Sequence, residues 1–224
     1  MFAGGAVAIV GLAVLGFFLW MVPKAAAREA KSACAGLRVS GPAMCNGEPC
    51  PLPMQMPNFT ALDHAGNPVD FQQRYAGKVV LINFWASWCG VCKTEKPKLL
   101  RMAEELAGND FKVVTLASDR GWTDVLLALV QSLTTTQIPT GEVSLDQAKE
   151  IYGRALPRGL PFTVLLDPPE GDNTIGQIAS SWGIKAVPES ALIDRKGQIR
   201  AYFVNKRDWE SPVAETCLRS VIDE

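Results

Sequence analysis

The sequence has little histidine and no excess of positive or negative charge. It has one histidine in 224 residues, too few for most histidine-based metal sites. Its 22 basic residues nearly balance 23 acidic ones, so nothing electrostatic suggests nucleic acid as a partner. Six cysteines are too few for a disulfide scaffold but too many to ignore. The length suits one domain with an appendage, and 48% hydrophobic residues exclude wholesale disorder.

Charge is wholly absent from residues 2–22, FAGGAVAIVGLAVLGFFLWMV. As a helix this segment would span about 30 Å, the thickness of a bilayer's hydrocarbon core. We predict that residues 1–23 are a transmembrane anchor or a signal segment. The length favours an anchor, whereas the small residues at 25–27 resemble a cleavage site, and both alternatives stay open. Lys24, Arg28 and Lys31 follow the segment and no basic residue precedes it, which taken alone predicts a cytoplasmic C-terminal domain.

The rest of the chain divides by composition at about residue 57. Residues 24–56 carry several prolines and glycines and three cysteines, Cys34, Cys45 and Cys50, which predicts an irregular tether. From residue 57 to 224 strands and helices alternate, which predicts an α/β domain with a central mixed sheet and helices on both faces. An insertion at about 121–160 would be a lid, a substrate surface or a tolerated extra segment. We expect strands at 59–62, 78–85, 111–117, 162–167, 190–194 and 198–204, and helices at 92–107 (broken early by Pro97), 122–133, 146–152, 175–182 and 212–222.

Two cysteines stand where a buried strand is expected to give way to a helix. Cys89 and Cys92, in WCGVCK, follow the apolar run 78–85. A cysteine at a helix N-terminus faces unpaired N–H groups and the positive end of the helix dipole, which favour its thiolate. The thiolate is the nucleophile in disulfide exchange, and two intervening residues place the second sulfur one turn along. We therefore expect Cys89 to be the exposed, attacking sulfur and Cys92 the more buried, resolving sulfur.

A C-x-x-C pair could instead be half of a zinc site or a structural disulfide. A zinc site needs a second pair of ligands, and His64, Cys217 and the tether cysteines lack the required spacing. A C-x-x-C that follows a tryptophan between a strand and a helix favours redox chemistry over both alternatives. We therefore predict no metal and no organic cofactor.

Two segments carry a resemblance to a known family. Residues 83–97, NFWASWCGVCKTEKP, and residues 182–194, WGIKAVPESALID, resemble the thioredoxin fold. More specifically, they are similar to the membrane-tethered thiol-disulfide oxidoreductases of the TlpA/ResA/CcmG type. The resemblance covers about three quarters of the chain, from residue 57 onward. It implies a thioredoxin-like fold and a dithiol active site at Cys89 and Cys92.

The second segment implies a partner for the thiols. In this family the matching proline is cis and packs against the active cysteines, so we expect a cis Val187–Pro188 bond. It would turn the backbone of Val187 toward the substrate beside Cys89. An ordinary turn proline is the alternative. Trp88 would pack beside the site and shield the thiols.

Glu95 matches the acidic residue of the family pattern C-x-x-C-x-x-E-x-P. Its carboxylate would raise the thiol pKa values or relay protons, unless it is simply a solvated helix residue. Asn83 stands where classical thioredoxins have a buried aspartate, and an amide cannot accept a proton. A relay would therefore use Glu95 or water.

The resemblance also answers the question of topology. The tethered family faces the oxidising side of the membrane, where disulfides persist, so we expect the domain on the periplasmic or extracytoplasmic side. The extra cysteines agree with this location. We expect one bridge within the tether, with the leftover cysteine joining Cys217. Alternatively, Cys217 is a small buried hydrophobe.

The function these features favour is protein disulfide reduction through Cys89 and Cys92, with Glu95 and Pro188 as further catalytic residues and Trp88 and Val187 contacting substrate. The resemblance implies protein thiol or disulfide clients, apocytochrome c among them, and a membrane electron donor of the thiol-transporter type. A dithiol oxidase and a redox-silent thioredoxin-like adaptor are the alternatives. A peroxiredoxin-type peroxidase would need a cysteine setting that WCGVC lacks.

Overall fold

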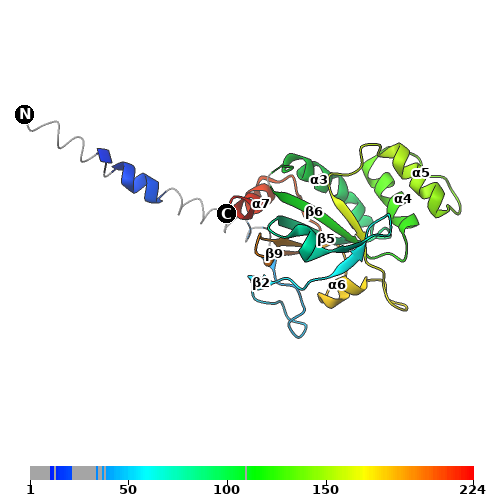
Figure 1. Ribbon diagram of the computed structural model, residues 1–224, viewed down its shortest axis with the longest axis horizontal. Helices are drawn as coiled ribbons and strands as arrows, with labels where there is room; N and C mark the ends of the chain where they lie inside the picture. The colour runs from blue at the N-terminus through cyan, green and yellow to red at the C-terminus, as the bar shows by residue number, and fades with distance from the viewer. Residues whose placement is uncertain (1–10, 13, 22–33, 35–36, 38, 109) are drawn as a thin grey trace, which may run out of the picture.

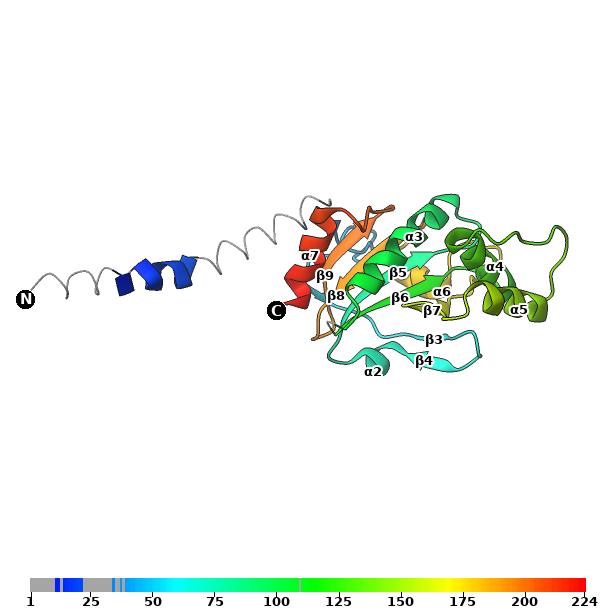
Figure 2. The same cartoon turned by 90° about the horizontal axis from the view of Figure 1, so that it is seen from above.

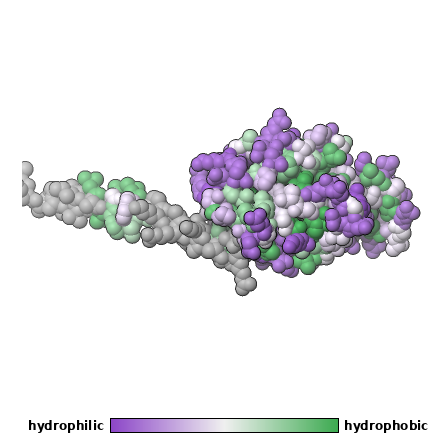
Figure 3. All heavy atoms as spheres, turned by 90° about the horizontal axis from the view of Figure 1, so that it is seen from below, coloured by the Kyte–Doolittle hydropathy of each residue, from purple (hydrophilic) through white to green (hydrophobic). Residues whose placement is uncertain are grey.

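The computed structural model describes residues 11–12, 14–21, 34, 37, 39–108 and 110–224. Within the predicted membrane segment, residues 11–12 and 14–21 are helical. Their large apolar side chains are exposed, as the space-filling view shows (Figure 3). Across the described part of the chain, no helix is both long enough and apolar enough to cross a membrane. The remainder of the predicted segment, residues 1–10, 13 and 22–23, lies outside the described residues.

The described strands form one mixed sheet in the order β1-β9-β8-β5-β6-β7-β3-β4, with β2 also paired to β9 (Figures 1 and 2). β5, β6 and β7 run parallel to one another. β8 pairs antiparallel to β5, and β3 pairs antiparallel to β7. The strands are β1 Val39–Ser40, β2 Met54–Gln55, β3 Thr60–Leu62, β4 Pro68–Asp70, β5 Val79–Trp85, β6 Phe111–Ala117, β7 Thr163–Leu166, β8 Glu189–Ile193 and β9 Gln198–Val204. The helices are α2 Phe71–Tyr75, α3 Gly90–Glu105, α4 Trp122–Leu133, α5 Leu145–Ala155, α6 Gln177–Ser181 and α7 Pro212–Ile222.

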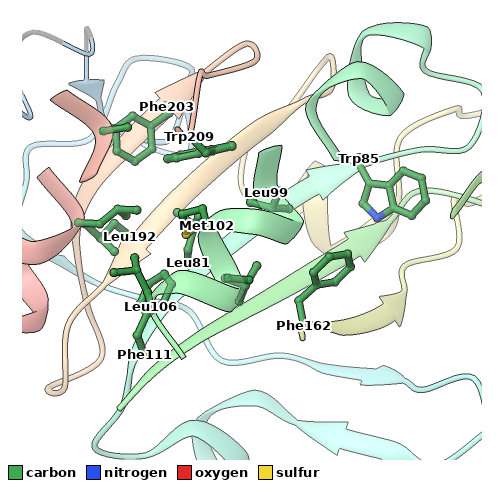
Figure 4. Packing of buried hydrophobic residues seen from close by; sticks show 14 of the residues in the cluster. Leu81, Trp85, Leu99, Met102, Leu106, Phe111, Phe162, Leu192, Phe203 and Trp209 are labelled. Atoms are coloured by element: carbon green, nitrogen blue, oxygen red, sulfur yellow. The ribbon is translucent and has the colours of Figure 1, made fainter. Parts of the chain in front are cut away.

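Helices cover both faces of the sheet, and β5 shows why. Every residue of β5 is buried, because its alternate side chains enter two separate cores. Val79, Leu81 and Trp85 face the core beneath α3, α4 and α7, whereas Ile82 and Phe84 face the core beneath α2 and α6. Figure 4 shows the first core, where Trp85 and Leu99 lie between the sheet and α3. Asn83, on the same side of β5 as Trp85, is the polar exception.

α3 differs from the sequence-based expectation at Pro97. The helix was expected to break early there, but it runs unbroken from Gly90 to Glu105 with Pro97 inside it. A proline removes one backbone donor and is normally costly in a helix interior. The apolar face of α3, with Leu99 and Met102 buried in the core, supplies the packing that keeps the helix whole.

The predicted insertion forms regular structure. α4 packs against α5, and an irregular segment joins them. α5 begins at Leu145, one residue before its expected start, where Ser144 and Gln147 form a reciprocal capping box. Its role as a lid or a substrate surface remains a prediction.

The segment predicted as a tether contributes to the sheet. β1 and β2 both pair with β9. Strands of two residues are too short to show an alternating pattern, so sequence periodicity could not reveal them. The sequence analysis did not predict β4 and α2 either, because they too are short.

The six cysteines of the chain all lie within the described residues and form three disulfides. Cys45 pairs with Cys50 and Cys34 with Cys217, which confirms the expected pattern of one bridge within the tether and one to the C-terminal helix. Cys217 is fully buried, as its apolar surroundings predicted, but it is also bonded. The third disulfide joins Cys89 to Cys92.

Candidate active site

The Cys89–Cys92 disulfide lies at the junction of β5 and α3. β5 ends at Trp85, and Cys89 is the N-cap residue of α3. The Cα atoms of the two cysteines are 5.3 Å apart. Cys89 is 7% exposed and Cys92 is completely buried. The order of exposure matches the expectation, although Cys89 is itself largely buried.

The start of α3 supplies a donor to the outer sulfur. The backbone N–H of Cys92 donates to Cys89 Sγ at 3.1 Å. N–H groups in a first helical turn have no partner within the helix, and they carry the positive end of its dipole. When the disulfide is reduced, this donor would stabilise negative charge on Cys89 more than on Cys92.

The Val187–Pro188 bond is cis, as predicted, and lies against the disulfide. The Val187 carbonyl oxygen is 3.5 Å from Cys89 Sγ. Pro188 is buried and directly precedes β8. The structure therefore brings together the two sequence segments that were singled out about a hundred residues apart.

Two apolar side chains flank Cys89 on the surface. Trp88 is 54% exposed and Val91 is 49% exposed. The Trp88 indole N–H donates to the carbonyl of Ser118 at 3.3 Å, which fixes the ring beside the site. Trp88 thus packs beside the disulfide and presents apolar surface to solvent, and its shielding of the thiols remains a prediction.

A buried carboxylate that the sequence did not reveal holds the loop before Cys89. Asp119 accepts hydrogen bonds from the Ser87 backbone N–H, at 2.9 Å, and from the Ser87 hydroxyl. Burial raises the pKa of Asp119, and the two bonds from Ser87 act in the opposite direction. Asp119 comes two residues after β6, at the same edge of the sheet as Cys89, and that position was the available signal.

Glu95 is a buried residue, so the solvated alternative is wrong. It is 2% exposed. Its Oε1 accepts from the backbone N–H of Arg207 at 2.8 Å and from the Trp209 indole at 2.9 Å. Its Oε2 accepts from Asn83 Nδ2 at 3.2 Å. Burial raises the pKa of the Glu95 carboxyl, while these hydrogen bonds and the neighbouring Lys96 act in the opposite direction.

The loop that leads to Val187 rests on the tether. Gly183 has φ +75°, and a Cβ there would lie 2.4 Å from the carbonyl oxygen of Ala43. Met44 and Val187 pack against the same apolar cluster. The hairpin closed by Cys45–Cys50 therefore supports the approach to the cis-proline.

We expect Gly183→Ala to lower the free energy of unfolding by about 1–3 kcal/mol, because the side chain would meet both an unfavourable φ and the Ala43 carbonyl. Gly153→Ala is the matched control, since Gly153 lies inside α5 with nothing within 4 Å of its added Cβ. That change should stabilise the protein by up to about 1 kcal/mol. Urea unfolding measures both, and equal midpoints for the two variants would contradict the prediction.

No cluster of three or more histidine, cysteine or acidic side chains suited to a metal ion occurs among the described residues. Cys89 and Cys92 are joined to one another, so in this state neither is available as a zinc ligand.

Comparison with known proteins agrees with this geometry. A family model described as Redoxin matches residues 53–218. The thiol-disulfide oxidoreductase ResA of Bacillus thuringiensis is 24% identical over 156 residues, covering 70% of this chain and 71% of that protein. The thiol:disulfide interchange protein DsbE of Allochromatium vinosum is 31% identical over 127 residues, covering 55% of this chain and 50% of that protein.

Solved structures give the same fold. The crystal structure of a protein assigned as the thiol:disulfide interchange protein DsbE of Chlorobium tepidum matches with a TM-score of 0.56 and 25% identity. The match covers 76% of this chain and 96% of that one. A mixed sheet with helices on both faces and a dithiol at the end of a central strand is therefore a thioredoxin-like arrangement.

Proposed function

Since the chain belongs to the redoxin family and is a thiol-disulfide oxidoreductase, we propose that Cys89 and Cys92 are its catalytic thiols and that they reduce disulfides in other proteins. The observation that carries the proposal is the position of Cys89. It is the outer sulfur, it caps α3, and it receives the Cys92 N–H at 3.1 Å. A reduced Cys89 at this place has the features of a nucleophilic thiolate.

The reaction proceeds in two exchanges. The Cys89 thiolate attacks one sulfur of the client disulfide, forms a mixed disulfide, and expels the other client sulfur as a thiolate. Cys92, after losing its proton, attacks Cys89 Sγ and releases the second client thiolate. The client gains two electrons, and the enzyme is left with the Cys89–Cys92 disulfide.

The surface around Cys89 suits an extended polypeptide. The Val187 carbonyl beside Cys89 Sγ can accept a backbone hydrogen bond from a client strand, held in place by Pro188. Trp88 and Val91 offer apolar contact on the same side. Neither feature selects one side-chain type, which supports proteins as a class of client. Apocytochrome c is one such client that the family resemblance suggests.

Glu95 is proposed as the proton acceptor for Cys92. It lies one helical turn beyond Cys92 and both side chains are buried, so water has poor access to the resolving thiol. A carboxylate in that position can take the thiol proton as the second exchange begins.

We further propose that residues 57–224 form the catalytic domain on the extracytoplasmic side, carried by the tether 24–56 and an anchor within residues 1–23. The disulfides Cys45–Cys50 and Cys34–Cys217 support an oxidising compartment. A membrane protein of the thiol-transporter type would return two electrons to Cys89 and Cys92 after each cycle.

The reduction potential of the Cys89–Cys92 pair tests the direction. Equilibration of the protein with glutathione and dithiothreitol buffers, followed by alkylation and mass spectrometry of the peptide containing both cysteines, gives the potential. We expect a value near or below about −230 mV, that of a reductant. A value near about −120 mV would identify an oxidase and reverse the reaction. Cys92→Ser, which cannot form the pair, is the control for incomplete alkylation.

A further inference from the structure

A lysine is completely buried on α3, the helix that carries the disulfide. Lys96 has no exposed surface and follows Cys92 by four residues on α3. Its Nζ donates to Asn83 Oδ1 at 2.7 Å. An ammonium group removed from water is costly unless a counter-charge and hydrogen bonds compensate for the loss. An apolar side chain would fill this position more cheaply, so the amine requires an explanation.

Trp85 is arranged around this amine. The Lys96 Nζ lies 4.1 Å from the centroid of the Trp85 ring, the geometry of a cation–π contact. The Trp85 indole N–H is buried and meets no acceptor among the described residues. The tryptophan thus directs its ring face to the amine, while its own donor goes unused.

Asn83 connects the amine to Glu95. The amide oxygen of Asn83 accepts from Lys96, and its amide nitrogen donates to Glu95 Oε2 at 3.2 Å and to Ser190 Oγ at 3.0 Å. The negative end of the amide dipole therefore faces the lysine and the positive end faces the carboxylate. Such an arrangement stabilises a charged lysine and a charged glutamate together.

Two further charged residues, Arg207 and Glu189, lie near this network and have hydrogen-bond partners. Arg207 donates its backbone N–H to Glu95, and its guanidinium donates to the carbonyls of Leu37, Asn205 and Lys206. Glu189, on β8, accepts from the hydroxyl of Tyr202. Lys96 and Glu95 are both buried, and the charge of each favours the charged form of the other.

Lys96 can be protonated, and so serve as a counter-charge, at neutral pH. Burial lowers the pKa of Lys96 to about 7, while the Glu95 carboxylate acts in the opposite direction. The ammonium form is therefore present at and below neutral pH. Burial acts on Glu95 in the unfavourable sense, because it favours the protonated carboxyl.

Resting on the proposed function of Cys89 and Cys92, we propose that Lys96 is a positioning residue that keeps Glu95 ionised through the Asn83 amide. In this way it extends disulfide exchange to lower pH. Lys96 itself does not touch the sulfurs or the client. It acts only by keeping the Glu95 carboxylate ready to accept the Cys92 proton.

The pH profile of exchange tests the proposal. We expect Lys96→Met to move the acid limb of the rate to higher pH by at least about one unit, so that the rate at a given pH on that limb falls about tenfold. In Glu95→Gln that limb should be absent. The double variant should match Glu95→Gln, because Lys96 has no effect without Glu95. Lys98→Met is the matched control, since Lys98 pairs with Asp208 at the surface, and its profile should equal that of the wild type.

Infrared spectroscopy gives a readout that does not depend on turnover. At pH 7, the difference spectrum between Lys96→Met and the double variant should contain the carbonyl band of a protonated carboxylic acid. The corresponding difference between the wild type and Glu95→Gln should lack it. A wild-type pH profile in Lys96→Met, or no such band in that variant, would overturn the inference. Failure of the proposed function is separate, because the wild type itself would then show no exchange through Cys89 and Cys92.

Discussion

Cys89→Ser is expected to lower the reduction of insulin disulfides, with dithiothreitol as electron supply, by at least about a thousandfold. Serine has nearly the same size as cysteine, so the N-cap geometry and the fold should survive. Its hydroxyl does not ionise near neutral pH and cannot form the mixed disulfide. The change therefore removes the nucleophile and little else.

Cys92→Ser should fail at a different step. Cys89 keeps its position at the start of α3, so the first exchange still occurs. No buried thiol is then present to attack Cys89 Sγ, and the client stays attached. We expect the mixed disulfide to accumulate as a species seen by mass spectrometry under non-reducing conditions, and to disappear on addition of dithiothreitol.

Cys34→Ala/Cys217→Ala is the control, because it removes a disulfide that does not close the hairpin beneath Gly183 and leaves the proposed thiols in place. Its rate should stay close to that of the wild type. Equal activity of Cys89→Ser and the wild type would place the chemistry elsewhere or indicate an adaptor without redox activity.

The second large effect concerns stability. Cys34→Ala/Cys217→Ala should lower the free energy of unfolding by about 4–5 kcal/mol, because closing a long loop removes much of the entropy of the unfolded chain. Cys34 and Cys217 are separated by 183 positions, whereas Cys45 and Cys50 are separated by five. Loss of the shorter bridge should cost only about 2 kcal/mol in the same loop-closure treatment.

Guanidinium unfolding of both double variants without reductant measures the difference. Alanine replaces all four cysteines, so each variant loses similar atoms, although Cys217 is the more deeply buried. Equal midpoints, or a larger loss from the shorter bridge, would show that native-state packing outweighs loop closure.

The central features of the fold could be predicted because they are long and periodic. The apolar run that became β5 and the amphipathic repeat of α4 extend over several residues, so their patterns stand out. The meeting of Cys89 with Val187 could be predicted only from family resemblance, since no local pattern encodes a contact between segments so far apart.

Lys96 shows what sequence alone could not provide. A lysine in a helix is normally taken as a surface residue, and nothing in TEKPK distinguishes Lys96 from Lys98. Its burial depends on Asn83 and Trp85, which come from a strand on another part of the chain. Asp119 escaped prediction for a similar reason, because its partner Ser87 lies 32 positions earlier.

The Cys34–Cys217 bond has a mechanical consequence. A pull applied to the N-terminal end of the chain passes from Cys34 through the sulfur atoms directly into α7. Because this bond transmits the force past all the strands between the two cysteines, tension from that end does not separate β1 from β9 or disrupt the rest of the sheet. A protease that cuts the exposed connection between α4 and α5 would likewise leave two pieces still tied together.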